Sequence, residues 1–328
     1  MVTPGPRGGG SPPRRRARAT IRVLAIDGGG IRGLIPATVL AAIERRTARR
    51  TAELFDLIAG SSTGAILALG LAQPGRGGRP RYTAQALARL YSRQGPAIFS
   101  RSAWRRLATL DGIADERYPR EPLARALAQM LGEAPLSACL TRVMVPTYDL
   151  EQRAPFIFKS WRGDRNGVPM REVALAAAAA PTYFEPALTA VGGAARPLID
   201  GGVFANNPAM CAYAEAIREF PSNSRFLIVS LGTGQLTRPI SHEAAAGWGR
   251  AAWLRPILDV VFDGVTDTVS YQLRQILGAD YIRLQTELRG ASEAMDDASA
   301  PNLAALKAEA RRLLREQAAE LGRLCALL

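Results

Sequence analysis

The sequence predicts a single α/β domain built around a mainly parallel sheet. Short apolar runs that suit buried strands alternate along the chain with longer segments of helical periodicity, which is the pattern of strand–helix–strand units. The 328 residues, 48% hydrophobic and 22% charged, suffice to bury a sizeable core. No internal repeat or clean interior linker divides the chain, so we expect the domain to cover residues 20–328.

The first half of the domain contains two strand–turn–helix units. Residues 21–26 and 54–60 are apolar runs typical of buried strands. A helix is expected after each, over residues 33–50 and 63–72, and the first carries basic residues in its last turns, where they suit the helix dipole. A loop rich in Gly, Arg and Pro follows at 74–81.

The second half continues the alternation. Further strands are expected at 141–150, 155–160, 196–200, 225–232 and 280–285. Helices are expected over 171–180, after 206–208, over 245–277 with a break near Pro256, and over 301–328.

A glycine-rich loop, "DGGGIRG", begins at Asp27 between the first strand and helix. Gly28, Gly30 and Gly33 satisfy the G-x-G-x-x-G pattern of dinucleotide-binding folds. Two features disfavour a nucleotide: Asp27 would place a negative charge beside the pyrophosphate, and Glu53 precedes the second strand instead of ending it. Glycines before a helix also aim backbone N–H groups at one point, which suits any oxyanion, including one formed only in a transition state.

A second loop, "GSSTG", follows the second strand and precedes a helix. G-x-S-x-G in this setting is the sequence form of a nucleophile elbow, in which Gly60 and Gly64 allow the tight turn that exposes Ser62. A turn of small residues without catalytic function is the alternative for this pattern taken alone. Two glycine turns that both follow strands favour the catalytic interpretation, because one can supply a nucleophile and the other the oxyanion donors.

A serine nucleophile needs a base. The single histidine, His242, would complete a Ser62–Asp200–His242 order, but it lies in a polar stretch typical of the surface. Asp200 ends a predicted strand and is followed by Gly201 and Gly202. A carboxylate alone can act as the base if burial raises its pKa from about 3.9 toward neutrality. An Asp-Gly-Gly turn by itself is also compatible with a purely structural role.

Together, "DGGGIRG", "GSSTG" and "DGGVFANNPA" resemble the motifs of the patatin-like phospholipases, in the same order, and the resemblance runs from about residue 21 to the C-terminus. Residues 177–186 and 296–306 are also similar to family segments. The resemblance implies a three-layer α/β/α fold and a serine lipid acyl hydrolase of the phospholipase A type. It also implies a Ser-Asp dyad that needs no metal or other cofactor.

The motif positions that match the family assign roles to individual residues. By this resemblance Ser62 is the nucleophile, Asp200 is the general base, and the Gly28–Gly30 loop forms the oxyanion hole. Arg32 matches the basic position of the loop, where it either orients the loop or meets a phosphate. The supporting glycines are Gly33, Gly60, Gly64, Gly201 and Gly202.

The composition of the chain limits which binding partners and which cellular location are expected for the protein. The first 19 residues are rich in Pro, Gly and Arg without an acidic residue, and we expect them to be disordered. The net charge of +13 and the low aromatic content of 6% fit an anionic membrane surface better than nucleic acid. The three cysteines lack a C-x-x-C pair, so neither disulfides nor zinc is expected. Without a signal-like segment or membrane span, a cytoplasmic protein is expected.

Two segments with aromatic residues and arginines are candidates for transient contact with a lipid surface. One spans 97–107 and contains Phe99 and Trp104, and the other contains Trp248 and Trp253. Packing of these aromatic residues in the core is the alternative. Two other functions also stay open: a phospholipase effector of antiphage defence that is activated by a cyclic nucleotide, and a non-catalytic nucleotide-binding protein. The sequence predicts no particular oligomeric state.

Overall fold

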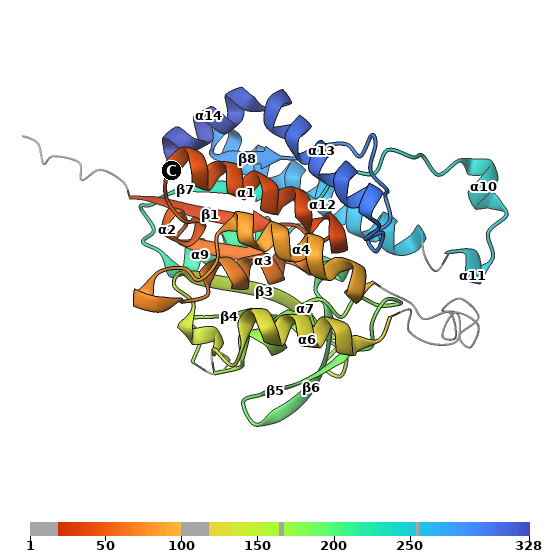
Figure 1. Cartoon of the computed structure of the whole chain (residues 1–328), viewed down its shortest axis with the longest axis horizontal. Coiled ribbons are helices and arrows are strands. Elements are labelled where there is room, and N and C mark those ends of the chain that lie inside the picture. Colours follow the sequence, from red (N-terminus) through yellow and green to blue (C-terminus); the bar gives the residue numbers. More distant parts are fainter. Residues whose placement is uncertain (1–18, 100–117, 164–166, 254–255) are drawn as a thin grey trace, which may run out of the picture.

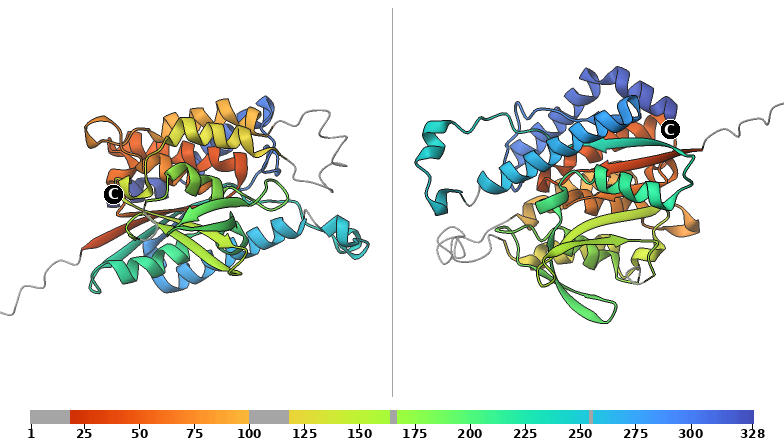
Figure 2. Two further views of the ribbon diagram at one scale, coloured as in Figure 1. Left: turned by 90° about the horizontal axis from the view of Figure 1, so that it is seen from below. Right: turned by 180° about the vertical axis from the view of Figure 1, so that it is seen from behind.

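A mixed eight-stranded sheet lies at the centre of the protein, between two layers of helices (Figures 1 and 2). The computed structural model describes residues 19–99, 118–163, 167–253 and 256–328. The strands are β1 (Thr20–Ile26), β2 (Leu57–Gly60), β3 (Arg142–Asp149), β4 (Ala154–Lys159), β5 (Ala187–Val191), β6 (Ala194–Asp200), β7 (Arg225–Leu231) and β8 (Tyr281–Leu284). The α/β class and the helix–sheet–helix layering predicted from the sequence are confirmed.

The strand order is β5-β6-β3-β2-β1-β7-β8, and β4 pairs with β3. The five strands β3, β2, β1, β7 and β8 pair in parallel. β4 and β6 both run antiparallel to β3, and β5 runs antiparallel to β6. The parallel part of the sheet therefore carries the two glycine loops at the carboxyl ends of β1 and β2.

Two strands share one edge of β3 and meet end to end. β4 pairs with residues Met144 to Asp149 of β3 and so occupies the other edge of β3 over that length. β2 aligns with the first part of β3 as far as Met144, and antiparallel β6 aligns from Thr147 to Asp149. The carboxyl ends of β2 and β6 consequently point toward each other, which brings the residues after Gly60 and the last residue of β6, Asp200, to one place.

The helices on one face of the sheet cover the larger core. They include α1 (Leu34–Thr47), α3 (Thr63–Ala72), α4 (Ala84–Ile98), α6 (Arg120–Leu131), α7 (Met170–Ala177), α13 (Ala300–Glu316) and α14 (Ala318–Leu327). Leu24 and Ile26 of β1 face this core, whereas Val23 and Ala25 face a smaller core. The helices associated with the opposite face are α8 (Gly202–Ala205), α9 (Ala209–Glu219) and α12 (Pro256–Leu277). The alternation along β1 follows from the two-residue repeat of a strand that is covered on both faces.

Several element boundaries differ from those predicted. The strand expected at 54–60 begins at Leu57, because the short helix α2 (Thr51–Leu54) is capped by a hydrogen bond from the Arg50 N–H to the Glu53 carboxylate. The helix expected over 301–328 divides at Gln317 into α13 and α14. β5 was not predicted, because its outward-facing residues, Leu188 and Ala190, are apolar while the buried Thr189 is polar, so the sequence lacks the polar–apolar alternation of a half-exposed strand.

An extension between β7 and α12 carries the short helices α10 (His242–Ala246) and α11 (Arg250–Trp253) away from the sheet (Figure 1). Trp248 and Trp253 stack edge to face on this extension, with ring centroids 5.0 Å apart. The membrane-contact hypothesis for these tryptophans stays a prediction. Trp104 and most of the 97–107 segment lie outside the described residues. Among the described helices, none combines the length and the hydrophobicity needed to cross a bilayer.

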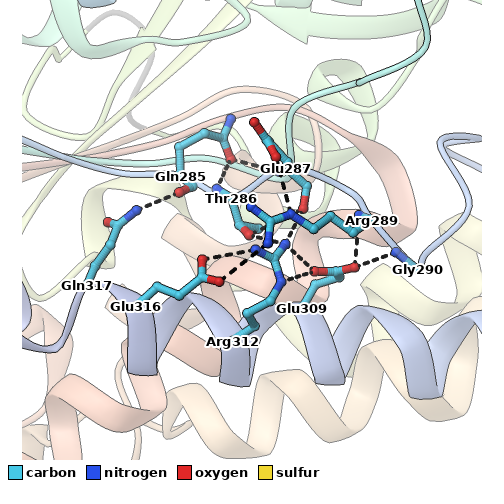
Figure 3. Close-up of polar contacts among 10 residues, drawn as sticks. Gln285, Thr286, Glu287, Arg289, Gly290, Glu309, Arg312, Glu316 and Gln317 are labelled. Carbon is cyan, nitrogen blue, oxygen red and sulfur yellow. Dashed lines mark hydrogen bonds and ion pairs between the residues drawn. The ribbon is translucent and has the colours of Figure 1, made fainter.

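Arg312 of α13 anchors the loop that follows β8 (Figure 3). Its guanidinium forms ion pairs with Glu309 and Glu316 and donates to the Thr286 hydroxyl at 2.8 Å and the Glu287 carbonyl at 2.6 Å. Glu309 is buried and also accepts two backbone N–H groups of this loop. The loop continues toward Met295, whose carbonyl accepts the Ile31 N–H at 2.8 Å, so the network supports the first glycine loop.

We expect Arg312→Ala to lower the free energy of unfolding by about 2 kcal/mol, because it removes several charge-assisted hydrogen bonds from a mostly buried group. Arg311 is exposed on the same helix and provides the matched control, for which Arg311→Ala should change stability by less than about 0.5 kcal/mol. Urea unfolding followed by circular dichroism measures both. Equal stabilities for the two variants would contradict the anchoring role.

Candidate active site

Ser62 occupies a strained turn between β2 and α3. Its backbone has φ 51° and ψ −121°, a conformation that costs a non-glycine residue of order 1–3 kcal/mol. The turn is compact: a Cβ on Gly64 would lie 2.2 Å from the Ile26 carbonyl oxygen, and one on Gly60 would lie 2.1 Å from the Gly64 carbonyl oxygen. Only glycine fits at these two positions, as the elbow motif predicted. Ser62 is half-buried and lines a cavity.

Asp200 reaches the same cavity from the end of β6. Its side chain is 1% exposed, and Oδ1 accepts the Gly202 N–H at 2.8 Å. Burial raises the pKa of Asp200 to about 6, although hydrogen bonds from the Ser62 side chain and the Gly202 N–H act in the opposite direction. The structure therefore brings Ser62 and Asp200 together, with a carboxylate whose pKa suits proton transfer near neutral pH.

The first glycine loop lies beside Ser62 and supplies free N–H groups. Gly29 and Gly30 line the cavity, and their N–H groups have no hydrogen-bond partner among the described residues. The Gly28 N–H instead donates to the Asn206 carbonyl oxygen at 3.0 Å. The prediction that Gly28 contributes an oxyanion donor therefore needs correction, because its only N–H is already used. Thr63, directly after the serine, also lines the cavity, and within the described part of the chain its N–H has no hydrogen-bond partner either.

The conformation of this loop is fixed from several sides. Gly30 has φ +57°, and a Cβ there would lie 2.1 Å from the Met295 carbonyl oxygen. The Gly28 carbonyl oxygen accepts the Thr233 hydroxyl at 2.6 Å. Gly33 and Gly201 are equally confined, since a Cβ would lie 2.4 Å from the Thr63 hydroxyl and 2.3 Å from the Pro146 carbonyl oxygen, respectively. The loop is thus held in place before any ligand binds.

Arg32 lies behind the loop, outside the cavity that contains Ser62. It is buried, and its guanidinium donates to the Gly29 carbonyl at 3.4 Å and the Glu293 carbonyl at 3.3 Å. Burial lowers the pKa of Arg32, while Asp259 and Asp263 of α12 counteract that shift. Of the two roles predicted for Arg32, this placement favours orienting the loop over meeting a substrate phosphate.

Arg283 of β8 is a site residue that the sequence analysis missed. Its guanidinium forms a bidentate ion pair with Asp27, with nitrogen–oxygen distances of 2.6 and 3.0 Å. Both side chains are almost fully buried at the base of the first glycine loop. The Asp27 charge is thus neutralised within the protein. A lone arginine in the otherwise apolar strand 281–284 was the available signal.

The cavity continues from Ser62 into an apolar channel between α4, α6 and the segment after α7. Phe99 lies here and packs against Tyr118 and Phe184, with ring centroids 5.5 and 6.3 Å away, which supports the core alternative for this aromatic residue. The other apolar side chains of the channel include Ile66, Leu90, Ile98, Leu123, Leu127, Met130 and Tyr183. Such a channel suits a hydrocarbon chain.

His242 does not reach this cavity. It is exposed at the start of α10 and is absent from the cavity lining, so the Ser-Asp-His arrangement is not formed among the described residues. Across all residues that the structure describes, no group of three or more His, Cys, Asp or Glu residues is arranged to hold a metal ion.

Comparison with known proteins identifies the family of this chain. A family model described as patatin-like phospholipase matches residues 24–213. The chain belongs to the patatin-like phospholipase family. Patatin-like protein 1 from Oryza sativa subsp. indica is 34% identical over 90% of this chain and 82% of its own length, and patatin-like protein 2 from Arabidopsis thaliana is 33% identical over 92% and 84%. The structure of VipD from Legionella pneumophila is similar with 12% identity and a TM-score of 0.39, covering 92% of this chain and 67% of that one.

Family membership identifies the protein as a serine ester hydrolase that acts on lipid esters, as the motifs predicted. The patatin-like match covers the elbow serine, the glycine loop and Asp200. The roles of these individual residues are proposals developed below.

Burial of Asp200 should make stability depend on pH. Because its pKa is higher in the folded than in the unfolded chain, the folded state loses stability as pH rises from about 4 to about 6. The loss reaches about 3 kcal/mol at neutral pH, at 1.36 kcal/mol for each pKa unit. Asp200→Asn should remove this loss, so the variant gains stability relative to wild type above pH of about 6.

Denaturant unfolding of both proteins between pH of about 4 and 8 measures the difference. Subtracting the unfolding free energies of the two proteins at each pH cancels the contributions of the other titrating groups. These include Asp27, whose pKa is also raised by burial. Parallel stability curves would mean that Asp200 titrates normally and is not desolvated.

Proposed function

We propose that the protein hydrolyses fatty-acyl esters of phospholipids through an acyl-enzyme on Ser62, with Asp200 as the general base. The observation that carries the proposal is the buried Asp200 carboxylate in one cavity with the elbow serine Ser62, beside backbone N–H groups that have no hydrogen-bond partner among the described residues. A raised pKa lets Asp200 accept and return a proton near neutral pH. Family membership supports the ester-hydrolase chemistry.

In the first half-reaction the Ser62 oxygen forms a bond to the ester carbonyl carbon while its proton passes to Asp200. The N–H groups of Gly29, Gly30 and Thr63, which line the cavity, would stabilise the resulting oxyanion, and one such donor contributes roughly 3–4 kcal/mol. The bond to the leaving alcohol then breaks, and Asp200 returns the proton to that oxygen. In the second half-reaction the oxygen of a water molecule bonds to the acyl carbon while a water proton passes to Asp200. The bond between that carbon and the Ser62 oxygen then breaks, which releases the fatty acid, and Asp200 returns the proton to Ser62.

The apolar channel supports a fatty-acyl substrate. Leu90, Leu127 and Phe184 lie along it. An acyl chain bound there would be removed from water, which stabilises the complex by about 25 cal/mol for each Å² of buried apolar surface. The ester carbonyl would then lie at the polar end of the channel, between Ser62 and the glycine loop. Under this proposal the channel binds an acyl chain of the phospholipid substrate. The head group then lies on the opposite side of the ester, outside the channel.

Ser62→Ala should reduce release of fatty acid from phosphatidylcholine vesicles and from p-nitrophenyl esters by about 10³-fold or more, because the nucleophile is lost. Asp200→Ala should cause a similar loss. The neighbouring Ser61 is the matched control: its side chain is fully buried and its hydroxyl has no hydrogen-bond partner among the described residues, so Ser61→Ala should keep activity.

Labelling by a fluorophosphonate probe reports on the nucleophile directly. Wild type and Ser61→Ala should be labelled, whereas Ser62→Ala should not, and circular dichroism checks that each variant is folded. A folded Ser62→Ala protein that still hydrolyses esters would exclude the acyl-enzyme mechanism.

The pH dependence of the reaction should follow Asp200. Since the base must be ionised, kcat/KM for an uncharged p-nitrophenyl ester should fall about tenfold per pH unit below the pKa of about 6 and reach a plateau above it. A profile without a change between pH of about 5 and 7 would contradict this assignment.

A further inference from the structure

Asn206 has an unusual position beside the proposed catalytic pair. It follows α8, is 8% exposed, and lines the cavity that contains Ser62. Its side-chain nitrogen donates to the Thr266 hydroxyl at 3.2 Å, while its side-chain oxygen is buried with no hydrogen-bond partner among the described residues. Its backbone carbonyl accepts the Gly28 N–H. No step of the proposed function uses this side chain.

The amide end of Asn206 lies close to both members of the pair. A Cβ on Gly28 would be 2.3 Å from Asn206 Oδ1 and 3.1 Å from Ser62 Cβ, so amide and serine flank the same backbone carbon. A Cβ on Gly202 would be 3.4 Å from Asn206 Oδ1 and 3.2 Å from Asp200 Oδ1. The terminal amide therefore lies on the same side of Gly28 as Ser62 and on the same side of Gly202 as Asp200, at the wall of the cavity that all three residues line.

The hydrogen bonds of the amide indicate which end should face the cavity during the reaction. A buried carbonyl oxygen without a partner is costly, and here it would also face developing negative charge. Rotating the amide by 180° exchanges Oδ1 and Nδ2 at nearly unchanged shape. Because the Thr266 hydroxyl can donate as well as accept, that hydrogen bond survives the rotation. The unpartnered acceptor is then replaced by an N–H donor.

We propose that Asn206 Nδ2 donates a hydrogen bond to the oxyanion of the tetrahedral intermediate, beside the N–H groups of Gly29 and Gly30. The inference rests on the proposed Ser62 mechanism and adds a side-chain donor to it. Residue 206 thereby has two linked effects: its backbone carbonyl occupies the Gly28 N–H, and its side chain supplies a donor to the same region. No bond is formed or broken at Asn206, and its proton stays on the amide.

The test is substitution of Asn206 with steady-state kinetics. Asn206→Ala should lower kcat by about 10²–10³-fold while KM changes by less than about threefold, because the donor acts in the transition state and not in substrate binding. Asn206→Leu keeps the approximate size and shape of the side chain without its N–H donors and without a new charge beside Asp200, and it should lose at least as much. Since this variant is nearly isosteric, it keeps the test decisive if Asn206→Ala fails to fold.

Asn207 is the matched control. It is equally buried, it bonds to the Ala209 N–H and the Ser230 hydroxyl, and it does not line the cavity. Asn207→Ala should lower the melting temperature while kcat per folded molecule stays within about threefold of wild type. If Asn206 had a purely structural role, Asn206→Ala would likewise lower the melting temperature and leave kcat per folded molecule almost unchanged. That result for Asn206→Ala would overturn the proposal.

Two substrates separate an oxyanion donor from other polar roles. Both a phospholipid and a p-nitrophenyl ester form the oxyanion, so Asn206→Ala should reduce kcat for both by similar factors. A loss confined to the phospholipid would assign the amide to the head group or the leaving alcohol and would overturn the proposal. The result for Ser62→Ala keeps the two hypotheses apart: if Ser62→Ala is inactive and Asn206→Ala is fully active, only the Asn206 inference fails.

Discussion

The proposed catalytic arrangement depends on the way β2 and β6 share one edge of β3. The two strands approach from opposite directions, β2 parallel to β3 and β6 antiparallel, and their carboxyl ends meet where β3 runs from Met144 to Thr147. Residues far apart in sequence are thereby fixed by backbone hydrogen bonds of a single sheet. Ser62 and Asp200 lie at these two strand ends, so their separation is set by the sheet register and not by mobile loops.

Close backbone contacts then place the remaining groups. The elbow packs against the carbonyl of Ile26, at the end of the strand that also begins the first glycine loop. A side chain at Gly64 would separate the two turns and, with them, the serine from the N–H groups of Gly29 and Gly30. The strain at Ser62 and the burial of Asp200 both cost stability, and the surrounding sheet and the apolar cores on its two faces offset that cost.

The charges around the glycine loop are arranged behind it, away from the channel. The Asp27–Arg283 ion pair and Arg32 are buried and do not line the apolar channel, and the partly buried Asp259 and Asp263 line a separate polar pocket with Asp27 and Arg32. This leaves neutral backbone N–H groups, an amide and one carboxylate as the polar groups nearest the ester. An uncharged oxyanion site suits an ester substrate, because binding in the ground state does not require a charge while the transition state gains one.

The sequence by itself determined the fold class, most strands and helices, and the elbow, because glycine spacing after apolar runs is a local signal. It also predicted Ser62 and Asp200 as the catalytic pair, through motifs that resemble a family. Only the tertiary structure decided that His242 stays outside the cavity, that Arg283 neutralises Asp27, and that the Gly28 N–H is already taken by Asn206. The physical reason is that the hydrogen-bond partners and the burial of a residue depend on segments that are distant in sequence. A local sequence motif does not specify which backbone donors those segments will occupy.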